Sequence, residues 1–120
     1  MRIFKSDEIK LEKSKATLFT EEVTRASLLS ENDAGDFVMS IVNFPKGVRN
    51  KFHTHSSDQV LIMTAGRGIV ATEDEEKLVA SGDIALIPAH IKHWHGATAD
   101  SDFAHISMIV NGAETVQLES

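Results

Sequence analysis

Residues 51–59 read Lys-Phe-His-Thr-His-Ser-Ser-Asp-Gln (KFHTHSSDQ), the most distinctive pattern in the chain. His53 and His55 stand one residue apart, among aromatic and β-branched neighbours that favour a strand. Alternate side chains of a strand share one face, and two residues of rise separate their Cα atoms by roughly 7 Å. Both imidazoles can therefore approach one ion, and Gln59 follows with an amide oxygen. We interpret the stretch as a candidate metal site, although solvated histidines on a strand would give the same pattern.

Composition limits the classes of protein to consider. The chain has 120 residues, 42% of them apolar and 25% charged, which is enough for one domain with one core. The net charge is −6, and no Lys/Arg cluster is present to follow a phosphate backbone, so we expect no nucleic-acid partner. The chain has no cysteine, so any metal must be held by nitrogen and oxygen. The first residues lack the apolar run of a signal peptide or membrane span, and we expect a cytoplasmic protein without a membrane partner.

Short apolar segments recur along the chain between turn-forming residues, and no segment shows the periodicity of an amphipathic helix. Clusters rich in Gly, Pro, Asp, Asn or Ser break the chain at 31–36, 45–47, 66–68, 81–83 and 99–102. Besides the histidine strand, we predict strands at 23–29, 37–44, 59–64, 69–72, 77–79, 84–88, 93–98 and 103–110. This spacing predicts an all-β sandwich or barrel.

Strand parity brings further histidines into the same picture. His93 and His95 share one face of their predicted strand, and His105 shares a face with Phe103, Ser107 and Ile109. Five of the six histidines can thus converge on one interior. Buried imidazoles without partners are costly, so such a cluster indicates a ligand in a small-molecule cavity at a barrel mouth.

Two spaced motifs carry a resemblance to a known family. The first comprises Gly47, His53, His55, Gln59 and Gly66. The second comprises Gly82, Pro88, His90 and His93. Their order and spacing resemble the two cupin motifs, with Gln59 where most cupins have Glu and His90 where a Gly is usual. The resemblance implies a double-stranded β-helix, the cupin jelly-roll barrel, as a single domain over residues 1–120. The motifs cover 47–97, and residues 1–30 form an N-terminal flanking segment.

Within the cupins, the chain is similar to small bacterial proteins labelled carboxymuconolactone decarboxylase-like, and among them to manganese-dependent hydroxynitrile lyases. This resemblance implies one divalent metal per chain, bound by His53, His55, Gln59 and His93. It also implies that His95 and His105 lie beside the metal in the pocket, where we expect them to be the catalytic acid/base residues. Mn is the expected metal, with Fe, Co, Ni or Zn as alternatives by ligand type. A neutral Gln59 in place of Glu leaves the dication uncompensated and makes it a stronger Lewis acid.

Three function classes stay open at this point. The first is a C–C lyase of hydroxynitrile-lyase type acting on a small molecule, with the metal as Lewis acid and histidine as acid/base. The second is a metal-dependent dioxygenase, and the third is a non-catalytic small-molecule-binding cupin. Ionisable residues beyond the ligand set favour catalysis. We also expect a homodimer, with the segment before Glu31 exchanged between subunits, because a sheet sandwich this short has edges to cover. His90 is expected to be a surface loop residue.

Overall fold

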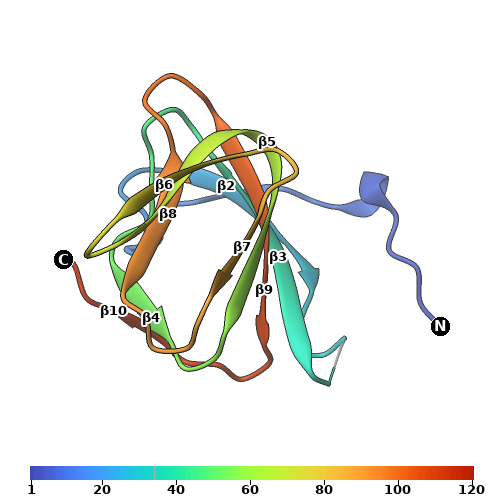
Figure 1. Cartoon of the computed structure of the whole chain (residues 1–120). Helices are drawn as coiled ribbons and strands as arrows, with labels where there is room; N and C mark the ends of the chain where they lie inside the picture. Colours follow the sequence, from blue (N-terminus) through green and yellow to red (C-terminus); the bar gives the residue numbers. More distant parts are fainter. Residues whose placement is uncertain (34) are drawn as a thin grey trace.

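The computed structural model describes residues 1–33 and 35–120 and is built almost entirely from strands (Figure 1). A single 3-10 turn, η1 (Ser6–Glu8), precedes them. The strands are β1 (Glu12–Ser14), β2 (Val23–Leu29), β3 (Phe37–Phe44), β4 (His53–His55), β5 (Gln59–Thr72), β6 (Glu76–Ala80), β7 (Ile84–Ile87), β8 (His93–Ala97), β9 (Phe103–Val110) and β10 (Thr115–Gln117). No helix in the described part of the chain has the length and apolar character needed to cross a membrane.

All strand pairs are antiparallel, and they curl into a barrel. The main path of neighbours runs β1-β2-β3-β9-β5-β8-β4-β10, and β6 and β7 both pair with β5. The first part of β5 pairs with β9 and β7, whereas its second part pairs with β8 and β6. The strand β5 therefore runs through two sheets, one with β9 and β7 and one with β8 and β6, and joins them (Figure 1). The predicted all-β jelly-roll barrel is confirmed.

The sequence prediction of two strands, 59–64 and 69–72, is wrong, because β5 continues through Gly66 and Gly68. Gly66 has φ +70, and a Cβ there would lie 1.8 Å from the carbonyl oxygen of Asp102. A Cβ on Gly68 would lie 2.6 Å from the ring of Phe103. These glycines let β5 bend against β9 instead of ending, and the register shifts between Met63 and Ala65 mark the same bend.

The apolar core lies next to the buried histidines. Its largest fully buried apolar side chains are Phe44, Phe103, Leu61 and Met63, which alternate with outward residues along β3, β9 and β5. The rings of Phe44 and Phe103 stack with centroids 6.1 Å apart. The ring of His105 lies 5.4 Å from that of Phe44. The apolar core therefore packs directly against the buried histidines.

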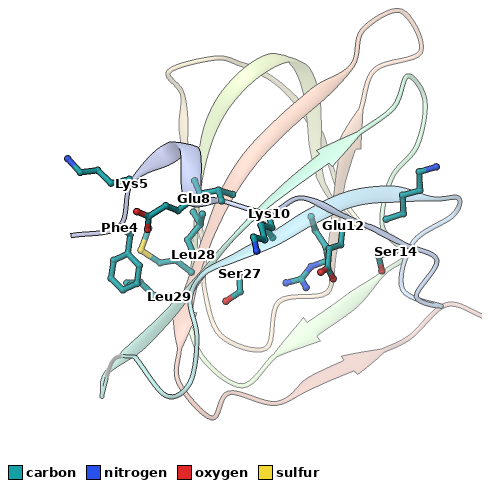
Figure 2. Close-up of a pocket in the computed structure, with 14 residues that line it drawn as sticks. Phe4, Lys5, Glu8, Lys10, Glu12, Ser14, Ser27, Leu28 and Leu29 are labelled. Carbon is teal, nitrogen blue, oxygen red and sulfur yellow. The ribbon is translucent and has the colours of Figure 1, made fainter. Parts of the chain in front are cut away.

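Two short edge strands were not predicted from the sequence. The strand β1 pairs with β2, and β10 pairs with β4, so that Thr115 lies opposite His55. Residues 1–11 lead into β1 as an arm that extends from the barrel (Figure 1). Figure 2 shows the cleft between this arm and β2, which has a volume of about 780 Å³ and is lined by Phe4, Leu28 and Leu29 among others.

Candidate metal centre and histidine pair

Three histidines from two strands meet in the barrel interior. The strand β4 supplies His53 and His55, and β8 supplies His93, which lies opposite His53 in the register. The potential ligand atoms of the three residues all lie within 4.8 Å of one another. Their relative exposures are 1%, 9% and 1%, so water covers none of them to a useful extent. The three residues form a group that can hold a metal ion.

A hydrogen bond fixes one ring nitrogen of each histidine. His53 Nδ1 lies 2.6 Å from the carbonyl oxygen of Lys51, and His93 Nδ1 lies 2.8 Å from that of Ile91. A carbonyl oxygen only accepts, so both Nδ1 atoms carry the proton. His55 Nδ1 lies 2.8 Å from Thr115 Oγ1. In the neutral rings of His53 and His93 the lone pair is then on Nε2, the arrangement usual for metal-ligating histidines. The Thr115 hydroxyl can donate or accept, so it is compatible with the same tautomer in His55.

Gln59 faces the same space, and its contacts indicate whether a cation fits there. Its Oε1 lies 3.1 Å from His93 Nε2, and its Nε2 donates to Ser107 Oγ at 2.9 Å. With the proton of His93 on Nδ1, Oε1 and Nε2 are two acceptors that face each other. His55 Nε2 is buried and has no hydrogen-bond partner among the described residues. Facing acceptors and an orphaned lone pair fit a cation that takes all of these atoms as ligands.

The electrostatics keep these imidazoles neutral. Burial, together with the neighbouring His93, lowers the pKa of His53 to about 3 and that of His55 to about 4. Burial also lowers the pKa of His93. All three rings are therefore uncharged near neutral pH, and a neutral ring is the form that binds a metal.

A second histidine pair adjoins the first group. His105 Nε2 lies 2.9 Å from His95 Nδ1, so one nitrogen donates and the other accepts. The ring of His95 lies 5.7 Å from that of His53 and 5.6 Å from that of His93, between centroids. Burial lowers the pKa of His95 well below its usual range and the pKa of His105 to about 4. This arrangement is a pair of neutral rings that can pass one proton between them.

Asn50 contacts both the backbone and the ring of His95. Its Oδ1 accepts from the backbone N–H of His95 at 2.8 Å, and its own N–H donates to the carbonyl oxygen of His95 at 3.0 Å. Its side-chain Nδ2 lies 3.4 and 3.3 Å from the two ring nitrogens. Asn50 is 3% exposed, so no water replaces these contacts. The amide therefore orients both the backbone and the ring of His95.

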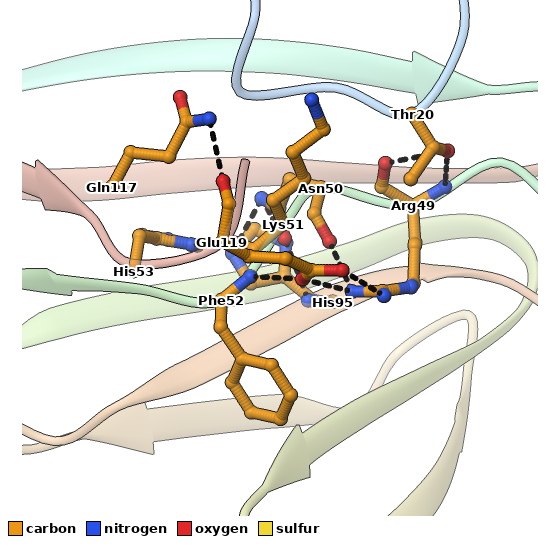
Figure 3. Close-up of polar contacts among 9 residues, drawn as sticks. All are labelled: Thr20, Arg49, Asn50, Lys51, Phe52, His53, His95, Gln117 and Glu119. Atoms are coloured by element: carbon orange, nitrogen blue, oxygen red, sulfur yellow. Dashed lines mark hydrogen bonds and ion pairs between the residues drawn. The ribbon is translucent and has the colours of Figure 1, made fainter.

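A surface network ties Asn50 to the C-terminal segment (Figure 3). Arg49 donates to the carbonyl oxygen of Asn50 at 2.9 Å, and its guanidinium stacks 4.6 Å from the centroid of the Trp94 ring. Glu119 accepts from Arg49 Nη2 at 2.9 Å and from the backbone N–H of Phe52 at 2.8 Å. These contacts hold the C-terminal segment against β4, next to the candidate metal ligands.

An inner cavity of about 240 Å³ adjoins both histidine groups. It is lined by Leu18, Phe19, Arg25, Ser40, Val42, Phe44, Asn50, His53, His55, Gln59, His95, His105, Ser107 and Thr115. The lining combines aliphatic and aromatic side chains with imidazoles, amides and hydroxyls. Such a cavity suits a small organic molecule with one polar reacting centre.

The structure brings together all six residues that were singled out from the sequence, and their roles as ligands or acid/base groups stay predictions. The side chain of His90 does not join this group, as expected: it is exposed in a turn with φ 67, although its backbone N–H donates to the carbonyl oxygen of His55 at 2.8 Å. Sequence reasoning missed Asn50 and Thr115. Asn50 precedes His53 by three residues without a motif of its own, and Thr115 lies 60 residues from His55.

The family follows from a comparison with known proteins. Residues 40–110 match the model of the cupin domain family, which is more than half of the chain. The chain is a cupin. It is 33% identical over 99 residues to an (R)-mandelonitrile lyase of Granulicella tundricola, a match that covers 80% of this chain and 74% of the relative.

Solved structures agree with this cupin fold. A cupin-like protein of Thermotoga maritima is 27% identical, with a TM-score of 0.86 over 100% of this chain and 90% of that protein. The polyketide cyclase RemF of Streptomyces resistomycificus is 15% identical, with a TM-score of 0.87 over 100% and 87% of the two chains. At that identity the second likeness concerns the fold alone.

Proposed function

We propose that this cupin is a metal-dependent hydroxynitrile lyase, which cleaves a cyanohydrin into a carbonyl compound and hydrogen cyanide or runs the reverse addition. The observation that carries the proposal is the 2.9 Å contact between His95 and His105 directly beside the group of His53, His55 and His93. A protein that only binds a ligand has no use for a buried pair of proton-exchanging rings next to its metal site. The similarity to a mandelonitrile lyase supports the same reaction class.

The residues present fit a divalent metal. His53, His55 and His93 would hold it through Nε2, and Gln59 through Oε1, because these atoms face one another without competing donors. Manganese is the metal we propose first, on the resemblance set out above. When bound, such an ion supplies positive charge that polarises a substrate oxygen, undiminished by an anionic ligand. No described carboxylate shares the group with the three histidines.

The His95–His105 pair can carry out the proton transfers that cyanohydrin cleavage requires. Cyanohydrin cleavage removes the hydroxyl proton, breaks the C–C bond with its electron pair on cyanide, and delivers one proton to cyanide. In the His95–His105 pair, Nδ1 of His95 and Nε2 of His105 face each other, which leaves one outer nitrogen on each ring. A proton taken up at one outer nitrogen lets the pair release another at the opposite end. Asn50 keeps His95 oriented for both transfers.

An oxygen-using enzyme is the second candidate. Three imidazoles and one neutral oxygen ligand with open positions also suit an iron or manganese dioxygenase. The two candidates differ in their need for oxygen, since cyanohydrin cleavage consumes none. They also differ in their products, because only the lyase releases cyanide.

One assay separates the candidates. Protein purified without chelators or nickel resin is reconstituted with Mn, Fe, Co, Ni or Zn, and benzaldehyde and cyanide release from mandelonitrile are measured in air and under nitrogen. The lyase predicts equal release in both atmospheres, dependence on added metal, and loss of release in His53→Ala. Oxygen consumption with a substrate panel, and no cyanide release with any metal, would refute the lyase.

A further inference from the structure

Arg25 of β2 points into the barrel, where a charged side chain is unexpected. In the register, Arg25 lies opposite Val42 of β3, and Val42 lies opposite His105 of β9. Residues opposite each other on neighbouring strands project from the same face. Val23, two residues earlier on β2, is 1% exposed in the core, which confirms the inward direction. Arg25 therefore shares its face with a histidine of the candidate site.

Arg25 lines two cavities in addition to the cleft beside the N-terminal arm. The inner cavity of about 240 Å³ contains the histidines, and an outer cavity of about 750 Å³ lies between β2, β3 and the end of β9. Arg25, Ser40 and Ser107 line both of them. These three residues thus lie at the boundary of the two cavities, which we call the neck.

The guanidinium has no partner within the described residues. Arg2, Arg49 and Arg67 each form an ion pair, with Asp33, Glu119 and Asp100 respectively. Arg25, the remaining arginine of the chain, forms none, and no hydrogen bond of its side chain is found. Glu12 lies opposite Arg25 in the pairing of β1 with β2, yet their charged groups do not pair. A half-buried guanidinium with its five donors unused is a ready anion site.

Arg25 is the one Arg, Lys, Asp or Glu side chain among the described residues that line the inner cavity. The other polar groups that line it are hydroxyls, amides and imidazoles. No acidic residue is among them. The cavity lining therefore has a cationic side chain and no anionic one, in a protein whose overall charge is −6, and a metal ion held by the histidines would add to this positive charge. Such local reversal of sign indicates selection for an anionic molecule.

We propose that Arg25 binds a carboxylate of the substrate, so that the natural substrates are small aldehydes or cyanohydrins that carry a carboxylate away from the reacting carbon. This substrate class rests on the proposed lyase function, whereas carboxylate binding at the neck stands without it. The planar guanidinium forms two parallel hydrogen bonds with a carboxylate. Charge-assisted hydrogen bonds of this kind favour the anion over a neutral analogue by ~10- to 100-fold.

The test compares two aldehydes of nearly equal shape. Manganese-loaded protein is titrated calorimetrically with 4-formylbenzoate and with 4-formylbenzamide. The 3-isomers serve as a second pair, in which the aldehyde lies closer to the carboxylate or amide. Wild-type protein is expected to bind the carboxylate of at least one pair ~10- to 100-fold more tightly than its amide. Arg25→Met should remove this preference by weakening only carboxylate binding, and Arg25→Lys should retain part of it because charge remains without the planar fork.

Arg67→Met is the matched control, because it removes the same charge from an exposed arginine that lines neither cavity. It should keep the full preference. No preference in wild-type protein for either pair, or a preference that persists in folded Arg25→Met, would overturn the proposal. Cyanide release is measured separately: a carboxylate preference without turnover of any cyanohydrin would refute the lyase and leave the anion site standing.

Discussion

Replacing Thr115 with Val is expected to weaken metal binding without unfolding the barrel. Thr115 Oγ1 is the partner of His55 Nδ1 at 2.8 Å, and in the tautomer that leaves Nε2 free for a metal it accepts the proton of Nδ1. Without the hydroxyl, a proton on Nδ1 is left unsatisfied at a residue that is 9% exposed, which favours the other tautomer. That tautomer has a proton on Nε2 and cannot ligate. Valine is isosteric with threonine and favours strands, so β10 should persist.

The expected magnitude follows from the role of such partners. Loss of a hydrogen-bond partner of a metal-ligating histidine typically costs ~10- to 100-fold in affinity. This corresponds to ~1.4 to 2.7 kcal/mol. The assay is a competition titration of the metal-free protein with manganese and a chromophoric chelator at fixed pH. Thermal melting of the same metal-free samples reports on folding.

Two further variants make the Thr115 result specific. Thr115→Ser keeps the hydroxyl and should restore most of the affinity. Thr54→Val makes the same chemical change on β4, one residue from His55 and on the opposite face of the strand, and should bind manganese like the wild type. If Thr115→Val binds manganese within about twofold of the wild type, the hydroxyl does not control the tautomer of His55, and our account of the ligand geometry is refuted.

Further predictions concern catalysis, pH and assembly. Ala at His95 or His105 should lower cyanohydrin turnover at least ~10-fold with metal content unchanged, because general acid/base groups typically contribute ~10²- to 10⁴-fold; wild-type turnover in both variants would contradict their roles. Burial lowers the pKa of His53 to about 3 and that of His105 to about 4, below the usual 6.5, so the unfolded chain binds more protons in between. The free energy of unfolding of the metal-free protein should therefore fall as pH drops from about 6.5 to about 4, and these groups should leave it constant above about 6.5, which urea titrations at several pH values will check. On the outer face of β7, Ile84 and Leu86 are 69% and 64% exposed, and we propose that a second copy of this chain covers them. Light scattering should give a dimer that Leu86→Lys weakens, and a monomeric wild type at micromolar concentration would contradict this.

The local sequence pattern was sufficient to predict which side chains share a face of each strand. The alternation of strand side chains placed His53 with His55 and His93 with His95, and it placed His105 on the face of Phe103, which is in the core. The burial of all five histidines agrees with that parity. Parity alone does not say which strands are neighbours. The convergence of β4, β5 and β8 was expected from the spacing of the cupin motifs, and that of β9 from the resemblance to hydroxynitrile lyases.

Contacts between distant segments were not accessible in this way. The turn residues Gly66 and Gly68 indicated a break, yet they serve close packing against Asp102 and Phe103 in another strand. The strands β1 and β10 are short and largely exposed, and pairing with β2 and β4 stabilises them. The bond from Thr115 to His55 depends on that second pairing. The same holds for Arg25, whose inward direction is set by its register with β3.

The metal content of His53→Ala tests the central claim most directly. Wild type, His53→Ala and His90→Ala are expressed with manganese, purified without chelators or nickel resin, and analysed by elemental mass spectrometry alongside a melting curve that confirms folding. His53 is buried among the candidate ligands, whereas His90 is exposed in a turn next to them. We expect about one divalent metal ion per chain in the wild type and in His90→Ala, and less than about a tenth of that in folded His53→Ala. Full metal content in His53→Ala would contradict the assignment of the metal centre.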